Sequence, residues 1–423
     1  MTNPGSSPES LETPPLTAVH HPYAVLRNRD FLLYLIGRFV ASVGQQMLTV
    51  AVGWELYERT HSALNLGLVG LTQMVPMILF TLPSGHVADN YNRKRIIVLM
   101  TFVIACASLG LTLISWKHAD VFWIYFCLFA AGTARTFLWP ASSAFLPHLV
   151  SRQNFSKAVT WNSGSFHLSS VAGPAAGGAL IALTHHAATV YAVNTAAALI
   201  CLLLIGLVRR HHVVPVKERM TLSNLVVGFK FVFASRTILA TITLDLFAVL
   251  LGGATALLPV YAKDILRVGP TGLGFLQAAL PMGSLLSALI LAHRPPLQKA
   301  GRALLWAVAG FGLATIGFGL SHWFWVSFLM LFICGAADNI SVVVRHTLVQ
   351  LLTPDEKRGR VSAVNSLFIG TSNELGGFES GLVAHLVTPV FSVVSGGLGT
   401  ILVVLLVALV WPELRKYGRL DAG

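Results

Sequence analysis

Charged residues are scarce in this chain of 423 residues. Asp, Glu, Lys and Arg together make up 11% of it, against 55% for hydrophobic residues. A soluble domain carries about 25% charged residues, so the composition excludes an ordinary soluble protein. What recurs instead is the apolar run, often of the roughly 20 residues that a helix needs to cross a bilayer.

Cysteine is rare, and the common catalytic patterns are missing. The four cysteines each lie inside an apolar run, which predicts packing residues and no disulfide framework: Cys106, Cys127, Cys201 and Cys334. No Walker loop occurs, which argues against an ATP-driven pump. No nucleophile–base spacing stands out, so we expect neither an enzyme nor a cofactor.

Two histidine pairs do not predict a metal site. His185-His186 and His211-His212 fall between apolar runs, with no third ligand nearby. Adjacent residues do not share a helix face, and a structural zinc site needs four ligands. Solvated loop histidines are the better interpretation, and no metal is expected.

Acidic residues are outnumbered by basic ones, 17 to 29. The cations lie in short gaps between apolar runs and not on one face, so they do not predict nucleic-acid binding. Lys and Arg favour the cytoplasmic loops of membrane proteins. With the N-terminus inside, the outer loops carry only Arg59, Lys117, Lys263 and Arg267. Both termini are therefore predicted to be cytoplasmic.

The apolar runs predict an all-α membrane protein with twelve transmembrane helices. The spans lie near residues 31–56, 66–83, 96–115, 121–141, 159–183, 190–208, 238–261, 272–292, 303–321, 324–344, 363–386 and 391–411. The fifth and eleventh carry the most polar residues and are the weakest of the set.

The longest and most basic connection divides the chain into two halves. It predicts five regions: a disordered cytoplasmic tail (1–25), an N-terminal six-helix bundle (26–208), a cytoplasmic linker (209–236), a C-terminal six-helix bundle (237–412) and a second tail (413–423). Residues 222–233 of the linker are amphipathic, which is typical of a helix lying on the membrane surface.

A weak internal repeat indicates that the halves are related. A shift of 203 positions places Gly173 on Gly376 and Gly178 on Gly381, and a shift of 205 places Gly67 on Gly272. Such matches fit two pseudo-symmetric bundles related by an axis along the membrane normal.

The loop after the second span carries the most informative motif. Gly85, Asp89, Arg93 and Lys94 match the signature loop of the major facilitator superfamily, which this chain resembles. Asn92 stands where the family has a second glycine, and Asn tolerates left-handed backbone angles. The resemblance implies the twelve-helix facilitator fold and a cytoplasmic gate, in which the carboxylate and the cations lock two helix ends.

The fifth span narrows the resemblance. Its glycines and proline are similar to the glycine–proline motif of drug and metabolite antiporters, and close helix packing is the competing interpretation: Gly173, Pro174, Gly177 and Gly178. Nearly the whole chain resembles bacterial facilitators of the enterobactin-exporter type, for example at 258–264 and 353–361. That resemblance implies proton-driven export of a siderophore, drug or metabolite.

Polar residues inside the spans are the candidates for a substrate cavity. Arg38 begins a stripe that continues through Ser42, Gln45 and Thr49 at helical spacing. Interhelical hydrogen bonding is the alternative to a cavity. The candidate cavity residues are Arg38, Gln45, Asn162 and Asn365.

Ionisable residues inside the spans are the candidates for proton coupling, because a membrane charge usually faces a water-filled cavity or a partner. They are Asp245, Asp338, Glu374, Glu379 and Arg135. A fixed salt bridge is an equal alternative for Asp245. Either glutamate can pair with Arg135 or Arg345, and only one can face a cavity if the helix is continuous. Arg345 is expected to reach the headgroups.

The sequence as a whole predicts a monomeric, proton-coupled exporter of a small molecule in the bacterial inner membrane, working by alternating access. Its partners would be the substrate, protons and the lipid bilayer. A uniporter or importer of the same fold is the alternative within this class. A membrane receptor or scaffold that transports nothing is the alternative outside it.

Overall fold

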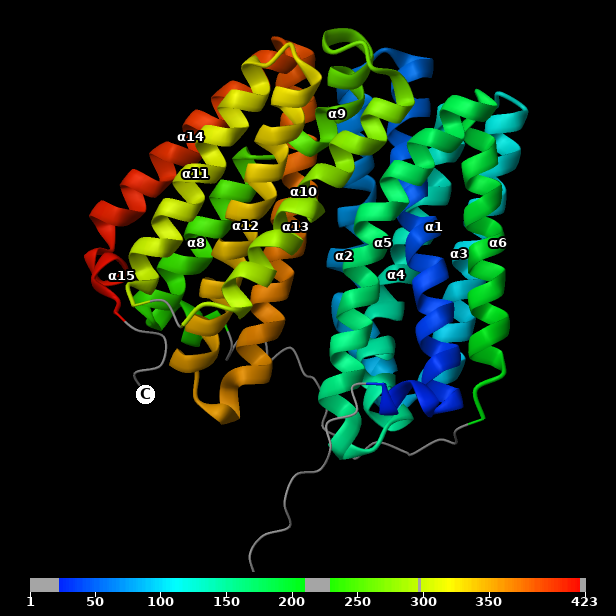
Figure 1. Cartoon of the computed structure of the whole chain (residues 1–423), viewed down its shortest axis with the longest axis horizontal. Helices are drawn as coiled ribbons and strands as arrows, with labels where there is room; N and C mark the ends of the chain where they lie inside the picture. Colours follow the sequence, from blue (N-terminus) through cyan, green and yellow to red (C-terminus); the bar gives the residue numbers. More distant parts are fainter. Residues whose placement is uncertain (1–22, 210–228, 296–297, 419–423) are drawn as a thin grey trace, which may run out of the picture.

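The structure, a computed structural model, describes residues 23–209, 229–295 and 298–418 (Figure 1). The tail 1–22, most of the linker and the last five residues lie outside the described residues. The described chain consists of helices and short connections, without strands. These helices form two bundles side by side, which confirms the predicted fold class.

The N half contains six long helices with short connections. They are α1 (Arg29–Thr60), α2 (Ala63–Asn90), α3 (Arg93–Trp116), α4 (Val121–Leu149), α5 (Phe155–Thr184) and α6 (Ala187–Gly206). Left-handed residues end α1 and α5, His61 at φ 46° and His185 at φ 58°. This conformation stops a helix in one residue, so the chain reverses into the next span at once.

The C half repeats the plan with one irregular span. It contains α8 (Arg236–Leu251), η3 (Ala254–Leu257), α9 (Leu258–Val260), η4 (Tyr261–Ile265), α10 (Gly269–Ala292), α11 (Ala300–Leu320), α12 (Phe324–Leu352), α13 (Asp355–Leu386), α14 (Pro389–Val410) and α15 (Pro412–Lys416). Residues 229–234, the described end of the predicted amphipathic stretch, are helical. Phe229 there stacks edge-on against Phe368 of α13.

The seventh predicted span is a broken helix. α8 ends at Leu251, and a 3-10 turn, a short α-helical turn and a π-helical turn follow. A Cβ on Gly253 would collide with the carbonyl of Gly376 and lie 2.7 Å from Ser380 Oγ. The missing side chain at Gly253 therefore lets α13 approach the break closely, and the one missing at Gly252 makes room for Phe311 of α11.

Eleven described helical segments are long and apolar enough to cross a bilayer. The remaining span, α13, which is the eleventh in chain order, is not among them, because polar and charged residues interrupt it along its length. It runs nonetheless through 32 residues beside the other spans. Large apolar side chains cover the outside, including Trp116, Trp323 and Trp325 at helix ends, where membrane proteins place tryptophan.

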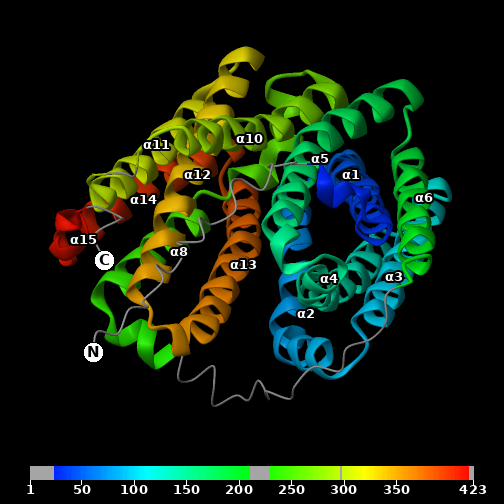
Figure 2. The ribbon, with the colours of Figure 1, turned by 60° about the horizontal axis from the view of Figure 1, so that its bottom comes forward.

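The packing confirms that the halves are pseudo-symmetric. In the N half, α1 packs on α5 and α6, α3 on α4 and α6, and α2 on α4. In the C half, α8 packs on α13 and α14, α11 on α12 and α14, and α10 on α12. These are the same contacts between corresponding spans. Across the halves, α2 meets α13 and α5 meets α10 (Figure 2).

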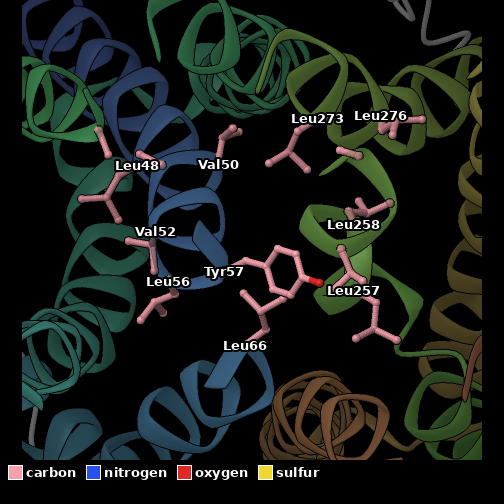
Figure 3. Close-up of a cluster of buried hydrophobic side chains, with 14 of the residues drawn as sticks. Leu48, Val50, Val52, Leu56, Tyr57, Leu66, Leu257, Leu258, Leu273 and Leu276 are labelled. Atoms are coloured by element: carbon pink, nitrogen blue, oxygen red, sulfur yellow. The ribbon is translucent and has the colours of Figure 1, made fainter. Parts of the chain in front are cut away.

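The halves join at one face of the membrane domain. We call the end where α1, α3 and α5 begin the terminal face, and the opposite end the far face. One apolar cluster draws residues from both halves near the far face, including Leu56, Leu66, Leu257 and Leu273 (Figure 3). The clusters nearer the terminal face each stay within one half. The far face is thus closed by an apolar seal.

Candidate functional site

A cavity of about 450 Å³ lies between the halves. Its polar lining is dominated by carboxamides and includes one cation and one carboxylate: Gln45, Gln46, Thr49, Gln73, Arg135, Ser170, Thr255, Gln277, Asn373 and Glu374. The apolar seal supplies part of the remaining wall, including Leu66 and Leu258. Both halves therefore contribute to one mid-membrane site, as substrate sites of secondary transporters do.

Arg135 of α4 reaches the cavity and is held there by α2. Its guanidinium donates a hydrogen bond to Gln73 Oε1. One turn earlier, a Cβ on Gly132 would lie 3.2 Å from Pro76 and 3.6 Å from Gln73 Cα. The close α2–α4 packing therefore sets the place of the guanidinium, and Gln73 orients it.

Glu374 of α13 brings the carboxylate from the other half. A Cβ on Gly70 of α2 would lie 2.5 Å from the Glu374 carbonyl oxygen and 3.5 Å from Oε2. Gly70 thus allows α13 to approach and sets the depth of the carboxylate. The charges of Arg135 and Glu374 interact across the cavity, and within the described chain the two groups form no direct ion pair.

The other coupling candidates lie elsewhere. Asp245 of α8 forms a buried ion pair with Arg345 of α12, with exposed fractions of 6% and 2%. The expectation that Arg345 reaches the headgroups is therefore wrong, since the carboxylate holds it inside the C half. Asp338 is half-buried beside Cys334. Glu379 lies next to Ser380 Oγ, at 3.4 Å, and is not a lining residue.

Of the four predicted cavity residues, only Gln45 lines the cavity. Arg38 is half-buried near Tyr34 and Cys201. Asn162 is half-buried on α5, and Asn365 is 2% exposed on α13. The polar stripe of α1 divides in the same way: Ser42 bonds Ser169 of α5 at 2.7 Å, while Thr49 lines the cavity.

The signature loop fastens helices within the N half. Arg93 hydrogen-bonds the carbonyl of Ala144, at 3.2 Å, and the ring of His148, both on α4. Lys94 donates to the carbonyls at the end of α6, at 2.8 and 2.6 Å. Gly85 and Asp89 are half-buried in the last turns of α2.

Asn92 does not make the left-handed turn expected of it. Its backbone is extended, with φ −64° and ψ 109°, and its side chain caps α3 by accepting from the Arg95 N–H. The two-residue connection between α2 and α3 needs an N-cap at this position, and Asn is a preferred one.

The glycine–proline motif divides its contacts between two helices. A Cβ on Gly177 would lie 2.9 Å from Met47 Cα, so this glycine and Gly173 pack against α1. A Cβ on Gly178 would lie 3.0 Å from Gly274 Cα of α10, in the other half. Pro174 lines the cavity. The motif therefore serves close packing both inside the N half and across the halves.

A polar latch also crosses the halves at the far face. Tyr57 of α1 donates to Asp264 of η4, and Figure 3 shows its ring reaching toward the C half. Glu58 and Lys263 lie 4.0 Å apart, and the Lys263 ammonium lies 5.8 Å from the Trp54 ring. Sequence reasoning missed this latch together with Gln46, Gly70, Gln73 and Gln277. It placed Lys263 in a loop, whereas the structure has it in the helical turn η4.

Comparisons with known proteins agree with this architecture. The sequence model of the transmembrane secretion effector family matches residues 20–421. The enterobactin exporters EntS of Escherichia coli O1:K1 and Shigella boydii serotype 18 are each 27% identical over 388 residues, which cover 92% of this chain and 93% of theirs.

Among solved structures, an inward-facing, occupied bacterial homologue of the human lysosomal transporter Spinster superposes with a TM-score of 0.73 and 15% identity. The match covers 94% of this chain and 98% of that one. A peptide transporter POT variant gives 0.72 at 10% identity, over 91% and 95%. At these identities the likeness concerns the fold alone.

Proposed function

This chain belongs to the transmembrane secretion effector family of the major facilitator superfamily, and on that premise we propose that it exports a small molecule in exchange for protons. A membrane transporter of the exporter type follows from the family and its relatives. What we propose beyond this is the coupling to protons, the residues of the site and the class of substrate. We place the protein in the bacterial inner membrane, as a monomer with both termini in the cytoplasm.

One observation carries the proposal: the cavity is lined by both halves and lies beneath a seal that also needs both halves. Moving one half against the other must open the seal and reshape the site together. That linkage is what alternating access requires. With the terminal face in the cytoplasm, as the basic residues of the loops predict, this state receives substrate from inside.

Glu374 is the proposed proton carrier. It is the carboxylate that lines the cavity, and it comes from the half opposite Arg135. When the far face opens, α13 separates from Gly70, and the carboxylate can take a proton from outside as the substrate leaves. Return to the inward-facing state releases that proton to the cytoplasm. One proton bound and released accompanies each molecule exported.

Enterobactin-type siderophores are the first substrates to test, because the curated relatives are enterobactin exporters. Carboxamides and a guanidinium in the cavity offer donors to catechol oxygens and amide carbonyls. A screen of siderophores, antibiotics and dyes in efflux-deficient cells compares this class with others.

The test is transport into proteoliposomes under an imposed pH gradient. We expect substrate movement to drive proton flux, read with a pH-sensitive dye. Glu374→Gln should abolish proton flux while substrate binding remains within about threefold. Glu379→Gln, five residues along the same helix and outside the lining, is the matched control and should transport normally. Transport that persists after the proton gradient is collapsed would favour a uniporter.

A further inference from the structure

A second hollow lies on the outer surface of the N half, away from the substrate cavity. It has a volume of about 510 Å³ and is formed by α3 and α6, which lie on the side of the N half remote from the C half (Figure 2). Lys94 and Arg95 line its end at the terminal face, and Val98, Leu99 and Phe102 follow along α3. Leu202 of α6 forms the opposite wall.

The hollow combines exposed apolar surface with positive charge that no carboxylate among the described residues pairs. No acidic residue stands in the first turn of α3, where the helix dipole makes cations unfavourable. Lys94 is bonded only to backbone carbonyls among the described residues, and Arg95 is exposed. Leu99 and Phe102 are 57% and 51% exposed. Cations at the membrane interface above an apolar groove match the two parts of an anionic lipid.

We propose that this groove binds an anionic phospholipid of the leaflet at the terminal face. The phosphate lies at Arg95 and Lys94, and an acyl chain lies along Val98, Leu99 and Phe102. The same lipid would neutralise the charge at the start of α3, the helix that Arg93 and Lys94 fasten to α4 and α6. The bound lipid therefore stabilises the signature loop without entering the transport pathway.

The C half supplies an internal comparison. Arg302 of α11 corresponds to Arg95 under the shift of 207 positions that places Gly67 on Gly274, and each is the third residue of its helix. It is also exposed and also in the first turn. There the backbone N–H groups of Ala300 and Gly301 donate to the carbonyls of Gly418 and Tyr417, at 3.0 and 3.4 Å. The protein's own C-terminal segment thus covers that helix start, and Arg302→Gln is a matched control.

Native mass spectrometry of the full chain tests the proposal. Purified protein is titrated with dioleoylphosphatidylglycerol or with the zwitterionic dioleoylphosphatidylcholine. We expect wild type to bind the anionic lipid more tightly, and Arg95→Gln to weaken that binding about fivefold. Arg302→Gln should leave it unchanged. Val98→Trp fills the groove and should reduce the binding of both lipids.

Three results overturn the proposal. They are equal affinity of wild type for both headgroups, equal losses in Arg95→Gln and Arg302→Gln, and full competition by free glycerol phosphate, which would identify a site for the phosphate alone. Thermal unfolding without added lipid checks that each variant is folded. Because lipid affinity is read on purified protein, the outcome is independent of whether the chain exports a siderophore.

Discussion

Gly178 of the N half meets Gly274 of the C half, and Gly381 of the C half meets Gly67 of the N half. A Cβ on Gly178 would lie 3.0 Å from Gly274 Cα, and one on Gly381 would lie 2.7 Å from Gly67 Cα. The two contacts are equivalent under the pseudo-symmetry, which relates Gly67 to Gly274 and not to Gly272, the residue that the sequence shift of 205 indicates. Two equivalent pairs of glycines therefore bring the halves into close contact.

The charges of the two halves are not equivalent. The N half places a guanidinium in the cavity, and the C half a carboxylate. The C half buries the Asp245–Arg345 pair between two helices, whereas the N half pairs Glu55 with Arg59 within α1 and uses its loop cations to bond backbone carbonyls. The helix contacts that open during transport are symmetric, because both sides of the seal open together. The charged groups are not symmetric, because those of the two halves have different roles.

The largest expected effect comes from breaking the buried Asp245–Arg345 pair of the C half. Arg345→Leu leaves Asp245 unpaired in a site 6% exposed, and breaking a buried pair costs about 3–5 kcal/mol. We expect a large fall in the unfolding temperature in detergent. The double variant Asp245→Leu/Arg345→Leu should recover most of it. A single variant as stable as the double one would contradict the assignment. Arg135→Gln should cost much less, because Arg135 lines the cavity and is not held in a direct ion pair among the described residues.

The symmetry of the seal is tested next. Gly178→Leu and Gly381→Leu each overpack one of the two equivalent contacts, at a cost of about 1–3 kcal/mol. That cost shifts the equilibrium between open and closed far faces by about 5- to 150-fold. Labelling of a cysteine introduced at Ala256, on the cavity wall, reports the shift from the far side. Markedly different effects of the two variants would show that the two glycine contacts do not contribute equally to closing the far face.

The latch gives a smaller effect in the same direction. Asp264→Asn weakens the bond to Tyr57, which joins the halves at the far face. A hydrogen bond to a charged group contributes about 1.5–3 kcal/mol, and partial exposure reduces this. We expect the labelling of the Ala256 position to rise severalfold.

Glu58→Gln is the smallest change and serves as the control for the latch. Glu58 and Lys263 are 4.0 Å apart with side-chain exposures of 55% and 23%, and such surface pairs contribute about 0–1 kcal/mol. Labelling of the Ala256 position should change by less than about fivefold. An effect as large as that of Asp264→Asn would mean that the Glu58–Lys263 ion pair, and not the Tyr57–Asp264 hydrogen bond, holds the halves together at the far face.

Residue type alone marks the candidates for the site, but it does not select among them. A charge inside an apolar span is costly wherever it lies, so Arg135, Glu374 and Asp245 all qualify as candidates from the sequence. The structure separates them, since Arg135 and Glu374 line the cavity while Asp245 is paired inside the C half. Because α13 is continuous through Gly376-Gly377, only Glu374 of the two glutamates is a lining residue. Gln73 escapes notice in the sequence because, unlike Gln45, it belongs to no polar stripe: the residues three and four positions away from it on the helix are apolar or glycine.

The sequence by itself determined the number, order and approximate limits of the spans. Burial of an apolar run in lipid depends on composition over about 20 consecutive residues, which is a local property. Tertiary structure decided which charges meet. Helix rotation and the approach of glycines across the halves brought Arg345 to Asp245, and Glu374 beside Gly70 and into the cavity of Arg135. Those contacts join positions that lie far apart in the chain, and no local pattern records them.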